Sequence, residues 1–332
     1  MTGHKAASLH LGVIGAGAWG TALAQVLATG GHDVLLWARE PDLVHDINHV
    51  HRNPLYLPGI PLTPKIWATS ALADFAPCDV VLVVTPAQHM RSVLADLPSM
   101  HADFILCAKG IEEKTGGLMI DAAREALPGR AMAVLSGPTF AHEVAVGQPT
   151  AVTLACEDRE QWDRLSAAIA RPHFRPYYSS DIIGAEIGGA VKNVLAIACG
   201  VVEGLELGQN ARAALIARGF AEMLRFGLAY GAEAETLSGL SGLGDLVLTC
   251  SSTSSRNFSL GLALGQGQSA KAIMADRSSV AEGAFTAPVL RRVAHDRQVD
   301  MPIVEAVCAL LEGRSSAPEM VDALLARPLK SE

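Results

Sequence analysis

The pattern of apolar positions changes near the middle of the chain. Up to about residue 180, short β-branched runs alternate with helix-like segments such as 116–127 and 158–170. The runs are DVVLVV (79–84), DFILCA (103–108), AMAVLS (131–136) and TAVTLAC (150–156). Strands that are apolar throughout and separated by helices are typical of a parallel sheet covered on both faces. The first half therefore predicts an α/β domain.

From about residue 182 the pattern has a helical period, with glycine breaks and no convincing strand. This half predicts an all-α domain. The boundary is expected near YYSSDIIG (177–184), where Ser180 or Asp181 could cap the first long helix. A chain of 332 residues is long enough for two cores, since single cores stop growing at roughly 250 to 300 residues. We therefore predict domains at 1–181 and 182–332.

A glycine pattern marks the start of the first domain. Gly15, Gly17 and Gly20 form GxGxxG directly after the strand-like LHLGVI (9–14), and GGHDVLLWARE (30–40) supplies a turn and a second strand. The same apolar stretch could instead be an export signal or a short membrane span. A βαβ unit of about 30 residues is the context that a dinucleotide-binding fingerprint requires. The glycines thus favour a doubly wound, mostly parallel Rossmann-type sheet over the export signal.

The end of the second predicted strand bears on the choice of cofactor. An acidic residue there binds the ribose 2′-hydroxyl of NAD, whereas Arg39 occupies the position in LLWARE. A guanidinium can pair with a 2′-phosphate, so NADPH/NADP is favoured, with NADH/NAD possible. The alternative is a solvated Arg39 beside Glu40, which could itself approach a ribose.

Amino-acid composition and net charge limit the class of protein and the kinds of ligand that fit the sequence. Half of the residues are hydrophobic, 18% are charged and the formal net charge is −8, which is typical of a globular protein and gives no basic footprint for nucleic acid. An anionic ligand must therefore be held by local cations. The cysteines lie far apart without CxxC spacing and are expected to be reduced core thiols of a cytosolic protein. They are Cys78, Cys107, Cys156, Cys199, Cys250 and Cys308. No metal site is expected.

Three polar clusters interrupt the apolar pattern. Lys109 follows a predicted strand, at the end where open α/β sheets bind ligands, and Thr139 lies in a Gly-Pro-Thr turn after another strand. Asp245 and Thr249 are four residues apart, on one face of a helix, and a Ser/Thr loop then leads to Arg256 and Asn257. Arginine, asparagine and hydroxyl groups on one loop could hold a phosphate. Taken singly, the alternatives are a helix cap at Asp245, a turn residue at Thr139 and a surface charge at Arg256.

A lysine lies inside the apolar stretch GGAVKNVLAIACG (188–200). In a helix, Gly188 and Gly189 share a face with Lys192, and we expect these glycines to leave room for a ligand. Burial near a second cation lowers the pKa of a lysine from about 10.4 toward the operating pH of a general acid. The alternative is a lysine that extends along the edge of the apolar surface into solvent.

Several motifs together resemble the bacterial NAD(P)-dependent glycerol-3-phosphate dehydrogenases in order and spacing. They are GAGAWGTALA, AKGIE, LSGPTFAHEV, GGAVKNVLAIACG, NARAALIARG, SGLGDLVLTC and SSRN. The resemblance runs from about residue 9 to beyond 300 and leaves out the first eight residues and the tail after about 315. It implies a Rossmann domain followed by an all-α domain, and interconversion of dihydroxyacetone phosphate and sn-glycerol 3-phosphate for glycerophospholipid synthesis. It also implies a cytoplasmic homo-oligomer, with a dimer favoured, a small phosphorylated substrate and no membrane insertion.

The resemblance also implies roles for individual residues. Lys192 matches the catalytic lysine, and Lys109 matches the lysine close to both cofactor and substrate. From the reaction we further expect Lys192 to exchange the proton and Lys109 to act as a second cation. Asp245 and Thr249 would orient the lysine or the substrate hydroxyls. The positions that match substrate contacts are Lys109, Gly137, Thr139, Lys192, Asp245, Ser255, Arg256 and Asn257, and Thr249 is added from its spacing. Those that match cofactor contacts are Gly15, Gly17, Ala18, Trp19, Gly20, Arg39, Lys109, Ala141, Arg256, Val280 and Glu282. Ala18 replaces a small hydroxyl residue of many relatives, which removes one possible phosphate hydrogen bond.

Two other functions fit parts of the pattern. One is a dehydrogenase of the same two-domain type that acts on a sugar acid or small hydroxy acid, for which the Arg256–Asn257 cluster would be superfluous. The other is an NADP-sensing protein without catalysis, in which Lys192 and Asp245 are only structural. Turnover of a keto-phosphate separates both from the function that the resemblance implies.

Overall fold

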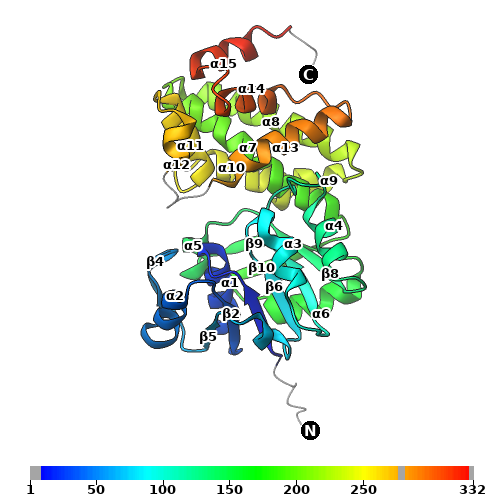
Figure 1. Ribbon diagram of the computed structural model, residues 1–332. Coiled ribbons are helices and arrows are strands. Elements are labelled where there is room, and N and C mark those ends of the chain that lie inside the picture. Colours follow the sequence, from blue (N-terminus) through cyan, green and yellow to red (C-terminus); the bar gives the residue numbers. More distant parts are fainter. Residues whose placement is uncertain (1–8, 276–280, 329–332) are drawn as a thin grey trace. The chain divides into compact units, whose positions relative to one another are not determined.

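The computed structural model describes residues 9–275 and 281–328, and the chain forms two compact units (Figure 1). The first unit contains residues up to Ala108 together with Ile120–Leu135 and Thr139–Ser180. The second unit starts at Asp181 and also includes two short earlier segments, Lys109–Met119 and Ser136–Pro138. These two segments are the loops that follow two of the strands predicted from the sequence.

The first unit is built on an eight-stranded sheet. Its order is β10 (Phe174–Ser179), β9 (Thr150–Ala155), β8 (Met132–Ser136), β7 (Asp103–Leu106), β6 (Val80–Val83), β1 (Leu11–Ile14), β2 (Val34–Trp37) and β5 (Ile66–Thr69). Strand β1 pairs in parallel with β2 and β6, and Leu11 lies opposite Val34 and Val80. The four predicted apolar runs form β6, β7, β8 and β9, so the mostly parallel sheet is confirmed.

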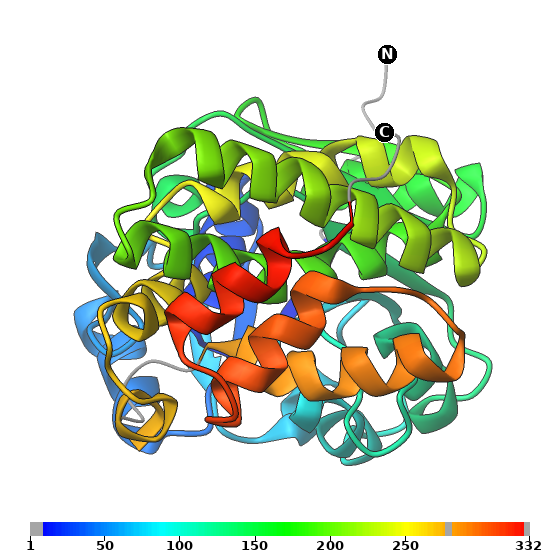
Figure 2. The ribbon, with the colours of Figure 1, turned by 90° about the horizontal axis from the view of Figure 1, so that it is seen from above.

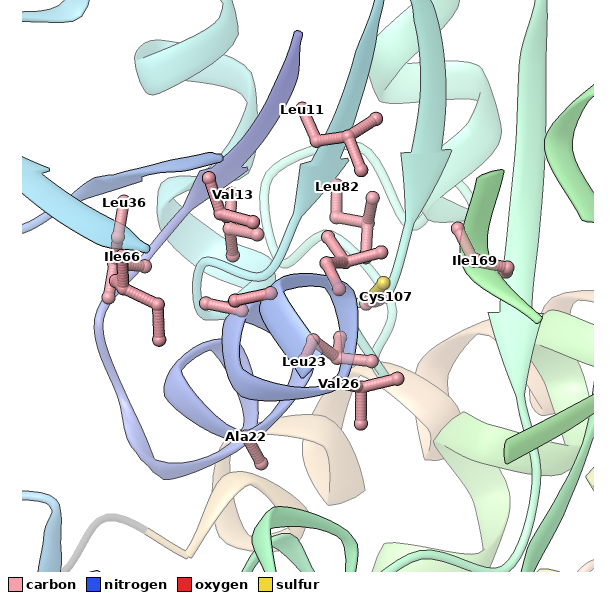
Figure 3. Packing of buried hydrophobic residues seen from close by; sticks show 14 of the residues in the cluster. Leu11, Val13, Ala22, Leu23, Val26, Leu36, Ile66, Leu82, Cys107 and Ile169 are labelled. Carbon is pink, nitrogen blue, oxygen red and sulfur yellow. The ribbon is translucent and has the colours of Figure 1, made fainter. Parts of the chain in front are cut away.

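Both faces of the sheet are buried because its strands carry apolar side chains on each side. Val80 and Leu82 of β6 join a core cluster with α1, whereas Val81 and Val83, which point to the opposite face, are also fully buried. Figure 3 shows part of this cluster, with Leu23 of α1 among the side chains that meet at the sheet. The stretch 11–28 is therefore a strand and a helix of the core, and the export-signal alternative is not supported.

The remaining elements of the first unit surround the sheet. The helices are α1 (Ala18–Thr29), α2 (Pro41–His45), α3 (Ala87–Ala95), α4 (Met119–Ala126), α5 (Ala141–Ala145) and α6 (Arg159–Ile169), with a π-helical turn η1 (Asp46–Val50) and a 3₁₀ turn η2 (Leu72–Phe75). Strands β3 (Arg52–Asn53) and β4 (Leu57–Pro61) form a small antiparallel pair. This pair follows α2 and η1, in the connection between β2 and β5.

The second unit is helical, as predicted (Figure 2). Its elements are α7 (Ile182–Gly204), α8 (Gly208–Ala229), α9 (Ala234–Ser238), η3 (Leu240–Gly244), α10 (Asp245–Cys250), α11 (Arg256–Gly265), α12 (Ala270–Ala275), α13 (Glu282–Asp296), α14 (Pro302–Leu311) and α15 (Ala317–Leu325). Asp181 is the N-cap of α7, because its Oδ1 accepts a hydrogen bond of 2.7 Å from the Gly184 N–H. Within the described ranges α7 alone is long and apolar enough to cross a membrane, yet 89% of its most apolar window is buried, as expected of a core helix.

Helices α7 and α11 touch through their backbones. A Cβ on Gly200 would lie 2.1 Å from the Phe258 carbonyl oxygen, and a Cβ on Gly261 would lie 2.0 Å from that of Ile197. One turn further along, a Cβ on Gly204 would lie 2.4 Å from the Leu262 oxygen. Glycine is therefore required at this crossing, because any larger residue would push the helices apart.

A buried carboxylate fixes the start of α14. Glu222 of α8 is 1% exposed and accepts hydrogen bonds from the N–H groups of Ile303 (2.7 Å) and Val304 (3.4 Å). These groups belong to the first turn of α14, which has no intrahelical partner for its N–H groups. Burial raises the pKa of Glu222 to about 7, and the two backbone bonds oppose this rise.

All six cysteines lie in the core without a disulfide, as the sequence predicts. Burial raises the pKa of Cys78 to about 11 and that of Cys156 to about 12. Such thiols stay protonated and behave as small apolar side chains.

Candidate active site

Lys192 lies in the middle of α7, inside the second unit. Its side chain is only 7% exposed, so the solvent-extended alternative does not hold. Its Nζ lies 2.5 Å from Oδ1 of Asp245 and donates a 3.0 Å hydrogen bond to Oγ1 of Thr249. Burial lowers the pKa of Lys192 to about 8; Asp245 opposes this shift and the neighbouring Lys109 adds to it. The ammonium group is therefore fixed in place and can lose its proton near neutral pH.

Asp245 joins two lysines. It is the first residue of α10 and is fully buried. Its Oδ2 lies 2.7 Å from Nζ of Lys109, which also donates a 3.1 Å hydrogen bond to the Gly137 carbonyl. Thr249, one turn further along α10, donates to Oδ1 of Asp245 at 3.3 Å. The predicted shared face of Asp245 and Thr249 thus exists, and Asp245 is not the cap of its helix, since the N-cap of α10 is Gly244.

The two glycines before Lys192 have a different role from the one expected. A Cβ on Gly188 would lie 2.3 Å from the Ser241 carbonyl oxygen, and a Cβ on Gly189 would lie 3.2 Å from Cγ of Lys109. The expectation that they leave room for a ligand was wrong, because protein atoms occupy that space. They instead allow the backbone near η3 and the stem of Lys109 to approach α7.

Asn193, the neighbour of Lys192, has a role that the sequence alone does not predict. Its amide donates to the carbonyl oxygens of Lys109 (3.4 Å) and Gly189 (3.3 Å). Asn257 donates to Oδ1 of Asn193 at 2.9 Å and accepts from the Gly283 N–H at 2.9 Å. Asn193 and Asn257 together therefore connect the loop of Lys109 with α11 and α13. The available signal was that Asn193 is the second polar residue of an apolar helix.

The first turn of α11 presents a cation to solvent. Ser255 caps this helix through a 3.3 Å hydrogen bond from the Phe258 N–H to its Oγ. Arg256 is exposed and forms no ion pair or hydrogen bond with any residue in the ranges 9–275 and 281–328. Asn257 keeps one amide N–H that is not bonded to a described residue. An exposed guanidinium at a helix N-terminus is suited to an anionic group.

The glycine loop of the first unit has the geometry that a dinucleotide needs. Gly15 has a φ of 115°, and a Cβ on Gly20 would lie 1.8 Å from the Gly15 carbonyl oxygen, so both positions require glycine. A Cβ on Gly17, by contrast, would have no atom within 4 Å. Ala18 and Trp19 begin α1, whose N-cap Gly17 provides no side-chain acceptor, so the first N–H groups stay available to an anion. The indole N–H of Trp19 is buried and has no partner among the described residues.

At the end of β2 lies the residue pair that bears on cofactor choice. Arg39 is 79% exposed and its Nη2 is 3.3 Å from Oε1 of Glu40. The hydroxyl of Tyr56 donates to the same oxygen at 3.4 Å. Glu40 is therefore held by two neighbours, and the Arg39 guanidinium remains accessible.

The other predicted contact residues lie at element ends. Thr139 and Ala141 are partly buried, and Ala141 begins α5. Glu282 begins α13 in the second unit. Val280 lies outside the described residues.

Comparison with known proteins identifies the family. The model of the NAD-dependent glycerol-3-phosphate dehydrogenase N-terminus matches residues 10–162, and that of the C-terminus matches residues 181–322. The glycerol-3-phosphate dehydrogenase [NAD(P)+] of Novosphingobium aromaticivorans is 68% identical over 98% of both chains. That of Caulobacter vibrioides is 56% identical over 97% of this chain and 98% of its own.

Solved structures agree with this assignment. The crystal structure of glycerol-3-phosphate dehydrogenase from Coxiella burnetii has a TM-score of 0.92 and 37% identity, covering 97% of this chain and all of that one. The yeast enzyme, from Saccharomyces cerevisiae, has a TM-score of 0.81 and 29% identity over 96% of this chain and 99% of its own. The chain therefore belongs to the family of NAD-dependent glycerol-3-phosphate dehydrogenases and is an oxidoreductase that binds a nicotinamide cofactor.

Proposed function

We propose that this enzyme reduces dihydroxyacetone phosphate to sn-glycerol 3-phosphate, with Lys192 as the group that exchanges the proton. The observation that carries the proposal is the buried Lys192 ammonium, held by Asp245 and Thr249 and lowered in pKa to about 8. A general acid is most effective when its pKa lies near the operating pH. The two neighbouring lysines provide positive charge where an alkoxide would form.

Residues of the second unit have separate roles in the proposed reaction. When bound, a nicotinamide cofactor would supply the hydride for the carbonyl carbon, so the protein must accommodate negative charge on the carbonyl oxygen. Lys192 donates its proton to that oxygen and is left as a neutral amine, which solvent reprotonates; in the reverse direction the amine accepts the proton. Lys109 stabilises the same oxygen as a second cation, and Asp245 keeps both lysines in position. No step requires a metal ion.

The substrate phosphate is assigned to the start of α11. Arg256 offers a charge-assisted pair, Asn257 offers its remaining amide N–H, and the helix N-terminus adds partial positive charge. Ser255 supports this site as the cap of the helix, and Gly137 and Thr139 are proposed to contact the substrate from the loop after β8. Binding energy from the phosphate can then orient the reacting carbon.

Replacing Arg256 with alanine is expected to raise the KM for dihydroxyacetone phosphate about 10- to 100-fold, because a hydrogen bond to a charged group contributes about 1.5–3 kcal/mol. The measurement is initial-rate kinetics at saturating NADPH. Arg327→Ala removes an exposed arginine that pairs only with Asp300 among the described residues, and serves as the control.

Dihydroxyacetone, which lacks the phosphate, serves as a second substrate that shows whether Arg256 acts on the phosphate. At saturating NADPH, Arg256→Ala should leave the low kcat/KM for that substrate unchanged, because the phosphate contact that it removes is absent there. An unchanged KM for the phosphorylated substrate would contradict the phosphate assignment. A wild-type protein that binds NADPH tightly but turns over no keto-phosphate would instead support the sensing alternative, and turnover of unphosphorylated hydroxy acids would support the other dehydrogenase.

NADPH is proposed as the preferred cofactor, supported by the accessible Arg39 at the end of β2. The proposed cofactor contacts are Gly15, Gly17, Ala18, Trp19, Gly20, Arg39, Lys109, Ala141, Arg256, Val280 and Glu282. Arg39→Ala should raise the KM for NADPH about tenfold and leave that for NADH nearly unchanged, because only NADPH carries the 2′-phosphate. The opposite result is that Glu40→Ala raises the KM for NADH while Arg39→Ala changes the KM of neither cofactor. In that case Glu40 binds the ribose hydroxyl and the enzyme prefers NAD.

We also propose a cellular compartment, an oligomeric state and a metabolic role for the enzyme. Six buried cysteines, none of them in a disulfide, support a reducing compartment such as the cytoplasm. A homodimer and the supply of glycerol 3-phosphate to glycerophospholipid synthesis are proposed from the family resemblance, and light scattering of the purified enzyme would measure the first.

A further inference from the structure

A buried asparagine, Asn53, forms hydrogen bonds with the glycine loop (residues 15–20) from the protein interior. Asn53 of β3 is 0% exposed. Its Nδ2 donates hydrogen bonds to the Ala16 carbonyl (2.8 Å) and to Oγ1 of Thr21 (2.7 Å), and its Oδ1 accepts from the Tyr56 N–H (2.9 Å). Both amide hydrogens and the amide oxygen are therefore in use, which fixes the orientation of the side chain.

The Ala16 carbonyl is held from two sides. Besides the bond from Asn53, it accepts a 3.2 Å hydrogen bond from the hydroxyl of Thr21, a fully buried residue of α1. Ala16 lies between Gly15 and Gly17 in the glycine fingerprint. Asn53 is 37 positions further along the chain, so this contact is a tertiary one.

Holding this carbonyl decides where the next N–H group points. In a trans peptide the C=O of one residue and the N–H of the following residue point in opposite directions, and the described residues contain no cis peptide. Because the Ala16 oxygen points toward buried Asn53, the Gly17 N–H points the other way. A Cβ on Gly17 would meet no atom within 4 Å, so the space beside the Gly17 Cα is open.

We propose that Asn53, together with Thr21, is a positioning residue for the dinucleotide: it fixes the Ala16–Gly17 peptide so that its N–H faces the pyrophosphate. The inference rests on the proposed function only in that a nicotinamide dinucleotide occupies this loop. Asn53 does not touch the cofactor itself. It acts through the backbone, so its loss should weaken NADPH and NADH equally.

A nearby asparagine provides a matched control. Asn48 of η1 also donates to a backbone carbonyl, that of Ala68 at 2.9 Å, and accepts from the Ala68 N–H at 2.7 Å. It anchors the same connection between β2 and β5, but these hydrogen bonds reach β5 and not the glycine loop. Asn48→Asp and Asn53→Asp therefore make the same chemical change, each placing a carboxylate oxygen against a carbonyl oxygen.

The experiment measures the dissociation constants of NADPH and NADH by protein fluorescence, together with the thermal midpoint of each variant. Asn53→Asp is expected to raise both constants at least tenfold, while the KM for dihydroxyacetone phosphate at saturating cofactor stays unchanged. Asn48→Asp should lower the thermal midpoint but leave both constants within twofold of the native values. Unchanged dissociation constants in folded Asn53→Asp, or an equal loss in Asn48→Asp, would overturn the proposal.

Thr21 gives a second, milder test if Asn53→Asp does not fold. Thr21→Ser keeps the hydroxyl that bonds Ala16 and Asn53, and should bind both cofactors nearly as well as the native enzyme. Thr21→Val keeps the shape and loses the hydroxyl, so its dissociation constants should rise several-fold; equal values for the two variants would contradict the proposal. Binding is measured without substrate, so a failure of the proposed reaction leaves this test intact.

Discussion

Replacing Lys192 with alanine is expected to lower kcat for dihydroxyacetone phosphate reduction by about 10³-fold, because general acid catalysis contributes about 10² to 10⁴. Lys192→Arg should be nearly as slow, since a guanidinium keeps the charge but does not release its proton near neutral pH. The measurement is single-turnover NADPH oxidation, which reports the chemical step. Added methylamine should restore part of the rate in Lys192→Ala, because it can take the place of the lost ammonium group.

The pH dependence of the native enzyme tests the same assignment. With a pKa of about 8 for Lys192, reduction should fall above pH 8 as the ammonium is lost. Oxidation of glycerol 3-phosphate should rise through the same range, because it needs the neutral amine. Near-normal turnover in a folded Lys192→Ala protein that binds NADPH normally would contradict the assignment. A reduction rate of the native enzyme that does not change with pH around 8 would contradict it as well.

Asp245→Asn should produce the second large effect, a loss of both activity and stability. Removing one partner of a buried ion pair costs about 3–5 kcal/mol, and here the carboxylate joins two lysines. Asp245 raises the pKa of Lys192, so without it this pKa falls below its native value of about 8. The midpoint for reduction should move to lower pH, and the rate at pH 8 should drop because most of the lysine is then neutral.

The stability of this variant should recover partly as the pH rises. Lys192 is protonated in the unfolded chain up to about pH 10.4, whereas in the folded variant it loses its proton below pH 8. Between the pKa of Lys192 in the variant and pH 8, the unfolded variant therefore binds more protons than the folded variant, whereas the native enzyme shows no such difference. The free energy of unfolding that the variant has lost relative to the native enzyme therefore becomes smaller as the pH rises. Denaturant unfolding at several pH values measures this.

Glu222→Gln is the matched control for Asp245→Asn. It also removes a buried carboxylate of the second unit, but Glu222 accepts its hydrogen bonds from the backbone N–H groups of Ile303 and Val304. It should leave the pH midpoint of reduction near 8. A midpoint that does not move in Asp245→Asn, or moves equally in Glu222→Gln, would contradict the role of Asp245.

The central strands were predictable because burial on both faces leaves a continuous apolar run. The runs at 79–84 and 150–156 show this for β6 and β9. The edge strands β5 and β10 were not singled out because each has a side open to solvent. Trp67 of β5 is 60% exposed and Tyr177 of β10 is 49% exposed, so polar and apolar residues mix there. Apolar content alone therefore describes the middle of the sheet better than its edges.

The candidate site was predictable where chemistry and helical spacing coincide. A lysine in an apolar helix and a carboxylate four residues from a threonine each carry a local signal, and the lowered pKa of Lys192 was expected from burial and a second cation. The contacts that depend on tertiary packing carry no such signal. Lys109 and Asp245 are 136 positions apart, and the space beside Gly189 is filled by Lys109 itself.

The backbone contact between α7 and α11 has a consequence for substrate choice. Lys192 belongs to one helix of this pair and Arg256 to the other, and glycines at the crossing leave no side chain that could adjust the spacing. The two backbones that carry the proposed proton donor and the proposed phosphate-binding cation are therefore held at a fixed separation. We expect it to favour keto-phosphates with one particular number of carbons between carbonyl and phosphate, and to reject longer homologues even when their charge is the same.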